Sequence, residues 1–178
     1  MDYRFKTEPY EHQLHALGAS HNKENFALFM EMGTGKSKVL VDNIAMLYDK
    51  GKINAALIVA PKGVYRNWER QEIPTHMPEH IVHNVVTWSP VTTKKQQKEN
   101  LKLFKHGDQL TIFLMNIEAF STKKGLDIAQ RFLLAHQTLM AIDESTTIKS
   151  PTARRTKNVL KLRNYAKYRR ILTGSPVT

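Results

Sequence analysis

The stretch MEMGTGKS, residues 30–37, decides the fold of this chain of 178 residues. An apolar run at residues 25–32 leads into it and predicts a strand, whereas apolar residues at helical spacing follow it over residues 37–48. Gly33 and Gly35 let the backbone curl so that its N–H groups point inward at phosphate oxygens. The positive end of the following helix is aimed at the same place. A strand, a glycine turn and a helix in this order therefore predict a site for a phosphorylated ligand.

The residues of this turn, which we call the phosphate loop, have separate expected roles. Lys36 would carry a mobile cation to the outer phosphates, and Ser37 would offer a hydroxyl ligand to magnesium. The general pattern begins with glycine, and this chain has Met30 at that position, although the remaining GTGKS is intact. The alternative is a glycine-rich turn that carries Lys-Ser by coincidence. Further contacts to the nucleotide are expected from the four residues before the lysine: Met32, Gly33, Thr34 and Gly35.

Short apolar runs alternate with longer polar or amphipathic stretches along the rest of the chain. This alternation predicts an α/β fold with a mainly parallel β-sheet and helices on both faces. Further strands are expected at residues 55–60, 81–88, 110–116, 138–143 and 171–173. Further helices are expected at residues 64–73, 92–104, 126–136 and from 151 to about 162. Ligands of such sheets bind at the carboxyl ends of the strands, so the functional residues should lie where the strands stop.

Two adjacent acids, Asp143 and Glu144, follow the apolar strand TLMAI. A phosphate loop needs a carboxylate at the end of a neighbouring strand to hold the magnesium shell. Asp143 would hold the metal directly or through water, and Glu144 would polarise the attacking water as a general base. An Asp-Glu pair alone can be a solvated loop, and it gains meaning because a phosphate loop precedes it. The expected catalytic residues are therefore Lys36, Asp143 and Glu144.

Four segments occur in an order that resembles the motifs of superfamily-two helicases and translocases, and most closely the Swi/Snf-type ATPases. They are MEMGTGKS at residues 30–37, APKGVYRNWERQEI at 60–73, IDESTTIKSPTARR at 142–155 and ILTGSPVT at 171–178. PYEHQ at residues 9–13 is similar to the leading element of that family. The resemblance implies that residues 1–178 form the family's N-terminal, RecA-like ATP-binding domain. It also implies that the second RecA-like lobe, with its arginine fingers, is absent from this sequence.

The resemblance implies roles for residues outside the phosphate loop. Gln13 should read the edge of the adenine, with Tyr10 or Phe5 packing on the base; otherwise Gln13 is an ordinary helix residue. For Pro61, Lys62 and Asn116, the resemblance implies contacts to a bound nucleic-acid strand. The alternative is that these residues belong to ordinary strand-to-helix loops. Thr173, Gly174 and Ser175 resemble the family's segment that couples the state of ATP to the binding of nucleic acid.

Two further positions carry expectations. The acidic box departs from many relatives at Ser145 and Thr146, so the coupling between ATP and the bound strand is expected to differ there. Trp68 follows Asn67 in the second motif and is expected to pack in the core or between lobes rather than to stack on a base.

The composition is that of a basic protein without cysteine, which excludes disulfides, thiolate metal sites and a cysteine nucleophile. The 27 Lys and Arg residues against 16 Asp and Glu give a formal charge of +11. Residues 149–170 hold nine basic residues and no acid. Such an excess favours a nucleic-acid partner, with a solvated basic surface as the alternative. The resemblance to Swi/Snf-type ATPases favours DNA over RNA as that partner. No apolar stretch is long enough to cross a bilayer, so we expect no membrane partner and a cytoplasmic or nuclear location.

These features predict a domain that binds ATP and Mg²⁺ within a DNA-dependent ATPase of the helicase or translocase type. A missing arginine finger costs roughly 10³ to 10⁵ in rate, so hydrolysis should be slow unless a second lobe acts in cis or in trans. One alternative is a stand-alone nucleotide- or DNA-binding module that regulates a partner without efficient turnover. A small kinase is a weaker alternative, against which the LTGSP segment argues.

Overall fold

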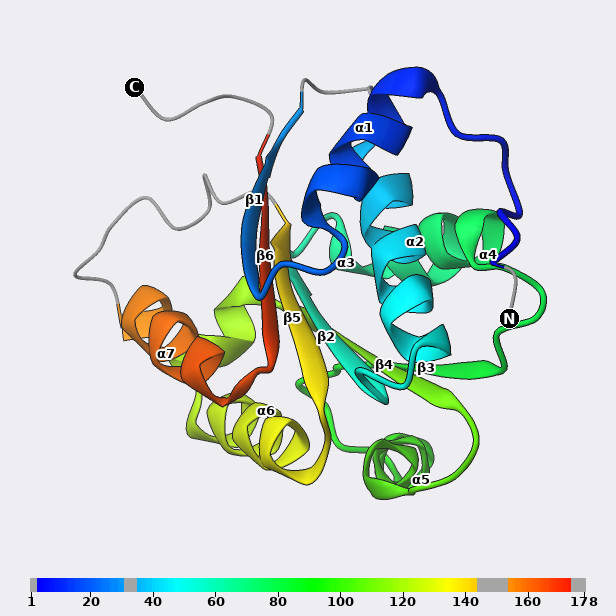
Figure 1. Ribbon diagram of the computed structural model, residues 1–178. Helices are drawn as coiled ribbons and strands as arrows, with labels where there is room; N and C mark the ends of the chain where they lie inside the picture. The colour runs from blue at the N-terminus through cyan, green and yellow to red at the C-terminus, as the bar shows by residue number, and fades with distance from the viewer. Residues whose placement is uncertain (1–2, 31–34, 144–153, 174–178) are drawn as a thin grey trace.

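A sheet of six strands forms the centre of the computed structural model, which describes residues 3–30, 35–143 and 154–173 (Figure 1). The strands lie in the order β1-β6-β5-β2-β4-β3. Their bounds are β1 Asn25–Phe29, β2 Ala55–Ala60, β3 His83–Thr87, β4 Leu110–Asn116, β5 Thr138–Asp143 and β6 Tyr168–Thr173. Each pairing between neighbours in this order is parallel. The predicted α/β fold with a mainly parallel sheet is confirmed.

Helices cover both faces of the sheet (Figure 1). One face carries α1 Glu11–Ser20, α2 Lys36–Asp49, α3 Tyr65–Asn67 and α4 Ile73–His76, with the π-helical turn η1 Trp68–Glu72 between the last two. The other face carries α5 Lys94–Leu101, α6 Lys123–Ala135 and α7 Arg154–Leu162, with the 3-10 turns η2 Lys102–Phe104, η3 Ile117–Ser121 and η5 Arg163–Tyr165. Within the described ranges, no helix has both the length and the apolar character that a membrane span requires.

The alternation of side chains along the strands divides the core into two parts. In β2, Ile58 packs in the cluster that includes residues of α1 and α2, whereas Leu57 and Val59 pack in the cluster that includes residues of α6 and α7. All residues of β2 are buried, as expected for a strand that is covered on both faces. Each buried aliphatic side chain contributes roughly 1.5–3 kcal/mol, so these two clusters fix the positions of the strand ends.

The central strands have the predicted bounds, and the differences lie elsewhere. β2, β4 and β5 agree residue for residue because uninterrupted apolar runs mark them. β6 begins at Tyr168, ahead of the predicted start at residue 171, and α1 is a helix that the apolar pattern does not predict. The predicted helix at residues 64–73 consists of α3, η1 and the start of α4. The predicted start of α7 at residue 151 lies outside the described residues.

Arg170 explains why β6 runs through a basic segment. Its side chain is 1% exposed, and its guanidinium donates to Asn43 Oδ1 and to the carbonyl of Ser20, both at 2.8 Å. Burial lowers the pKa of Arg170 to about 10. These bonds tie β6 to α2 and to the end of α1. Arg170 therefore holds the fold together and is removed from the nine basic residues that were candidates for contact with nucleic acid.

Candidate functional site

The carboxyl ends of three neighbouring strands bring the start of the phosphate loop close to Asp143. The register pairs Phe29 of β1 with Thr173 of β6, and Leu172 of β6 with Asp143 of β5. The chain leaving β1 stays on β6, because the N–H of Met30 donates to the carbonyl of Thr173 at 3.1 Å. Neighbouring strands are about 4.8 Å apart, so the ends of β1 and β5 lie roughly 10 Å from each other.

Helix α2 begins where the phosphate loop ends. Gly35 is its N-cap and has a left-handed backbone with φ of 83°. The first turn of α2 contains no acidic residue, so no carboxylate offsets the partial positive charge of the free N–H groups at this end of the helix. Lys36 and Ser37 are the first two helical residues, as the predicted roles require. Lys38, in contrast, is 3% exposed and forms a buried ion pair with Asp42 at 2.7 Å, so the lysine that begins the helix is the one suited to meet a phosphate.

Gln13 of α1 joins the leading segment of the chain to the phosphate loop. Its Nε2 donates to the carbonyl of Gly35 at 3.2 Å, and its Oε1 accepts from the N–H of Tyr10 at 2.8 Å. A Cβ atom at Gly35 would lie 2.0 Å from Nε2 of Gln13, so only glycine allows this approach. The side-chain amide is thus held by two backbone groups against the amino end of α2. The contact with Gly35 spans 22 positions of sequence, whereas the bond from Tyr10 belongs to the capping box of α1 itself.

A cavity of 420 Å³ opens beside this contact. Its lining consists of Thr7, Glu8, Tyr10, His12, Gln13, Gly35, Lys38 and His76. Tyr10 is 70% exposed, and its ring stacks on the ring of His12 with centroids 5.8 Å apart. Phe5 does not line the cavity and instead lies under the ammonium of Lys38, 5.0 Å from the ring centroid. Of the two aromatic residues suggested for packing on adenine, Tyr10 is therefore the one at the cavity.

Asp143 ends β5 with its side chain inside the protein, where it is 5% exposed. The indole Nε1 of Trp68 donates to Asp143 Oδ2 at 3.0 Å, and Trp68 itself is 1% exposed. The burial of Trp68 agrees with the expectation that it packs in the core. No local sequence pattern predicts the hydrogen bond between Trp68 and Asp143. Burial, and secondly the negative charge of Asp143, raise the pKa of Glu72 at the end of the same π-helical turn.

The side chains at this edge fit a magnesium ion by the chemistry of their donors. Ser37 offers a hydroxyl oxygen and Asp143 a carboxylate oxygen, and magnesium prefers oxygen ligands while keeping waters and substrate phosphates in its shell. In the part of the chain that the structure describes, no group of three or more His, Cys, Asp or Glu could hold a metal ion.

The residues suggested to contact nucleic acid differ in their surroundings. Lys62 is exposed in the turn that leads from β2 into α3. Pro61 is half-buried, and its carbonyl accepts from the N–H groups of Val64 and Tyr65 at the end of this turn. Asn116 is 6% exposed, and its Oδ1 accepts from the N–H of Ala119 at 2.9 Å, which is the capping bond of an ordinary strand-to-helix loop. Thr173 is 1% exposed at the end of β6. Six predicted site residues lie outside the described residues: Met32, Gly33, Thr34, Glu144, Gly174 and Ser175.

The basic stretch that includes α7 keeps most of its charges on the surface. Arg155 is half-buried and lies 3.9 Å from a carboxylate oxygen of Glu118, which is a weak surface pair. The exposed basic residues of this stretch, within the described range, are Arg154, Lys157, Lys161, Arg163 and Lys167. This exposed set is available to a polyanion, whereas Arg170 is not.

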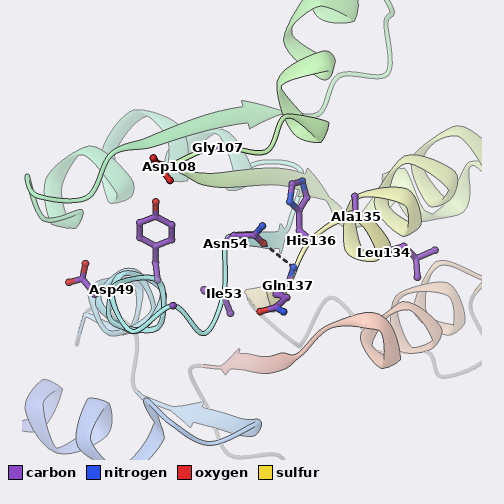
Figure 2. Close-up of a pocket in the computed structure, with 11 residues that line it drawn as sticks. Asp49, Ile53, Asn54, Gly107, Asp108, Leu134, Ala135, His136 and Gln137 are labelled. Carbon is purple, nitrogen blue, oxygen red and sulfur yellow. Dashed lines mark hydrogen bonds between the residues drawn. The ribbon is translucent and has the colours of Figure 1, made fainter. Parts of the chain in front are cut away.

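Another cavity, of 600 Å³, lies at the opposite edge of the sheet (Figure 2). Residues just before β2, β4 and β5 line it, among them Asn54, Asp108 and Gln137. Asn54 Oδ1 accepts from the N–H of Gln137 at 2.9 Å, so these polar groups satisfy each other. His136 also lines this cavity, and burial lowers its pKa. Since ligands of parallel sheets bind at the carboxyl ends of strands, we do not assign the nucleotide to this cavity.

Solved structures share this fold. The SWI2/SNF2 ATPase core of Sulfolobus solfataricus, solved in complex with dsDNA, superimposes with a TM-score of 0.72 at 21% sequence identity. The match covers 99% of this chain and 34% of the Sulfolobus chain. Two structures of UvsW, the helicase from Bacteriophage T4, have TM-scores of 0.66 at 12% identity. Both matches cover 95% of this chain, and they cover 53% of the first UvsW chain and 30% of the second. The chain thus spans about a third to a half of these structures, and the likeness establishes a RecA-like α/β fold.

The sequence itself gives the family. No curated protein sequence matches this chain significantly. The profile of the SNF2-related domain matches residues 12–178, which is nearly the whole chain. Each of the motifs from which the resemblance to Swi/Snf-type ATPases was drawn lies within that match or begins just before it. The chain belongs to the SNF2-related domain family.

Proposed function

We propose that this chain is the Mg²⁺- and ATP-binding lobe of a DNA-dependent ATPase of the helicase or translocase type. The observation that carries the proposal is the arrangement around Gly35. Its left-handed turn starts α2 with Lys36 and Ser37, and Gln13 is bonded to its carbonyl beside a cavity. Asp143 ends a strand that is separated from β1 only by β6. A phosphate, a base and a metal each have suitable protein groups in this arrangement.

The proposed roles follow from the chemistry of each group. The N–H groups at the start of α2 would bind phosphate oxygens, and Lys36 would offset the negative charge that develops on the outer phosphates. Gln13 would bond the adenine edge while Tyr10 covers the base. Ser37 and Asp143 would hold the magnesium ion, which supplies charge neutralisation between the phosphates when bound. Glu144, outside the described residues, would orient and deprotonate the attacking water.

Efficient turnover would need a second RecA-like lobe, in cis or in trans, because stabilisation by an arginine finger is worth roughly 10³ to 10⁵ in rate. The exposed Lys62 and the exposed basic residues of the stretch around α7 would bind the phosphates of DNA. The relative from Sulfolobus solfataricus was solved with dsDNA, which supports a duplex partner for this chain. Coupling between nucleic acid and ATP would then pass through the end of β6, where Thr173 contacts the chain leaving β1.

The test is nucleotide binding by titration calorimetry with ADP and excess Mg²⁺. Lys36→Ala should reduce the affinity at least about 100-fold, which corresponds to about 2.7 kcal/mol, because the cation at the phosphates is lost. Lys50→Ala is the matched control, since Lys50 is exposed at the other end of the same helix and should leave the affinity unchanged. Equal affinities for Lys36→Ala and the unsubstituted chain would refute the proposed site.

A further inference from the structure

The π-helical turn η1 places one indole against the acid at the end of β5. In this turn the N–H of Ile73 donates to the carbonyl of Trp68, five positions earlier, and π turns of this kind are rare and often lie at functional sites. Trp68 is packed in the apolar cluster with α2 and is 1% exposed. Its Nε1 nevertheless reaches Asp143 Oδ2 at 3.0 Å across 75 positions of sequence. A buried tryptophan needs a partner for its N–H, and here the partner is a carboxylate.

We infer that Trp68 is a positioning residue that sets the orientation of the Asp143 carboxylate for the metal. The inference rests on the proposed function, because it assumes a magnesium ion shared by Asp143 and a nucleotide. No role for Trp68 in the metal site follows from the sequence or from the family match.

The geometry of the contact carries the inference. Indole Nε1 can only donate, so its bond to Oδ2 specifies which carboxylate oxygen turns toward the core. A hydrogen bond to an ionised acceptor is about twice as strong as a neutral one, so rotation of the carboxylate about its last torsion is opposed. The indole cannot follow such a rotation, because it is buried in the core. A carboxylate held in this way meets the metal in one orientation rather than in many.

This role differs in its consequences from that of an ordinary core tryptophan. Partners that orient a metal ligand typically change metal affinity 10–100-fold when they are replaced. Loss of core packing alone would lower stability and would affect nucleotide binding equally with and without metal. The distinguishing quantity is therefore the gain in ADP affinity that Mg²⁺ produces, measured as the ratio of affinities in Mg²⁺ and in EDTA.

The experiment compares three forms of the full chain: unsubstituted, Trp68→Phe and Trp88→Phe. Phenylalanine keeps an aromatic ring in the core and removes the N–H. Trp88 is the matched control, because it is 3% exposed and belongs to the apolar cluster on the other face of the sheet. Trp68→Phe should reduce the gain from Mg²⁺ at least about tenfold and leave the affinity in EDTA unchanged. Trp88→Phe should change neither quantity.

The outcomes separate this inference from the proposed function. If the unsubstituted chain does not bind ADP, the proposed site fails, whatever the variants do. If it binds ADP with a gain from Mg²⁺ and Trp68→Phe keeps the full gain, the positioning role is overturned. Equal losses in Mg²⁺ and in EDTA would also overturn it, because they would show a purely structural role.

A second measurement needs no substitution and covers the case in which Trp68→Phe does not fold. The chain has two tryptophans, so its NMR spectrum contains two indole N–H signals. Addition of Mg²⁺ to the ADP-bound chain should shift the signal of Trp68 and leave that of Trp88 in place. An unchanged Trp68 signal at saturating Mg²⁺ would contradict the inference.

Discussion

Helix α2 has a glycine with positive φ at each end, and the two glycines differ in their contacts with the rest of the chain. Gly51 follows the helix with φ of 68°, and its N–H donates to the carbonyl of Tyr48 at 2.9 Å while that of Lys52 donates to Leu47 at 2.9 Å. This is the Schellman pattern that ends many helices. A Cβ atom at Gly51 would meet no atom within 4 Å, whereas at Gly35 it would meet Gln13.

Glycine is thus required at Gly51 by the local backbone alone, and at Gly35 also by a distant segment of the chain. Gly51 needs glycine only because the chain turns there in a left-handed conformation. Gly35 needs glycine for that reason and also because another segment of the chain is bonded to its carbonyl. The carboxyl edge of the sheet is thus assembled from distant parts of the sequence, whereas at the amino edge α2 ends by bonds within its own last turn.

Alanine at each glycine tests this difference and should give larger effects than the changes at Gln13 and His136. A left-handed alanine costs roughly 1–2 kcal/mol, so both Gly35→Ala and Gly51→Ala should lower the free energy of unfolding by about that amount. Only Gly35→Ala should also lower the affinity for Mg²⁺ and ADP, by at least about tenfold, because it displaces Gln13. Chemical denaturation and calorimetry measure the two quantities. Equal affinities for the two variants would show that the contact with Gln13 has no part in binding.

The contribution of Gln13 itself should be smaller. Gln13→Ala removes the proposed bond to adenine but leaves the phosphate loop in place, so ADP affinity should fall about tenfold and the preference for ADP over GDP should disappear. Gln96→Ala is a matched control, because Gln96 also donates to a backbone carbonyl, that of Thr87 at 3.1 Å, outside this site. A preference for ADP that survives in Gln13→Ala would mean that the base is recognised by other groups.

The smallest effect should be a loss of folding stability at low pH, caused by His136 at the amino ends of the strands. His136 is 9% exposed, its Nε2 donates to the carbonyl of Leu103 at 2.5 Å, and its pKa is lowered, chiefly by burial. The unfolded chain, with an ordinary histidine pKa near 6.5, binds the proton first. The stability that is present above about pH 6.5 should therefore decrease as the pH falls below it.

Denaturation at pH 7.5 and 5.5 measures this loss. His136→Gln should reduce the difference in unfolding free energy between the two pH values. His76, which lines the cavity beside Gln13, has a pKa that is also lowered by burial, so part of the loss should remain in His136→Gln. A difference unchanged by His136→Gln would show that its protonation is not coupled to folding.

The parts of the molecule that the sequence predicts are those with a local physical signal. Continuous apolar runs mark the central strands, and a glycine turn followed by Lys-Ser marks the start of α2. Helix α1 lacks such a signal, because its only buried residues are Gln13, Leu17 and Ser20 and they form no apolar stripe. The resemblance of the PYEHQ segment to a family element marks the residues at its start but predicts no helix there.

The parts that the sequence could not predict depend on contacts between distant residues. The Trp68 indole and the Asp143 carboxylate meet only because β5 lies beside β2, which leads into α3 and η1. Arg170 belongs to a basic run, and its burial follows from acceptors on α1 and α2 that no local pattern indicates. Asn116 carries a residue type suited to contact nucleic acid, yet its side chain caps the turn that follows it.

The decisive experiment is a crystal structure of the chain grown with ADP and Mg²⁺. We expect the diphosphate at the amino end of α2, the base between Tyr10 and Gln13, and one metal ion whose ligands include Ser37 and whose shell includes Asp143. A nucleotide bound in the cavity of Figure 2, or a metal ion far from Asp143, would contradict it.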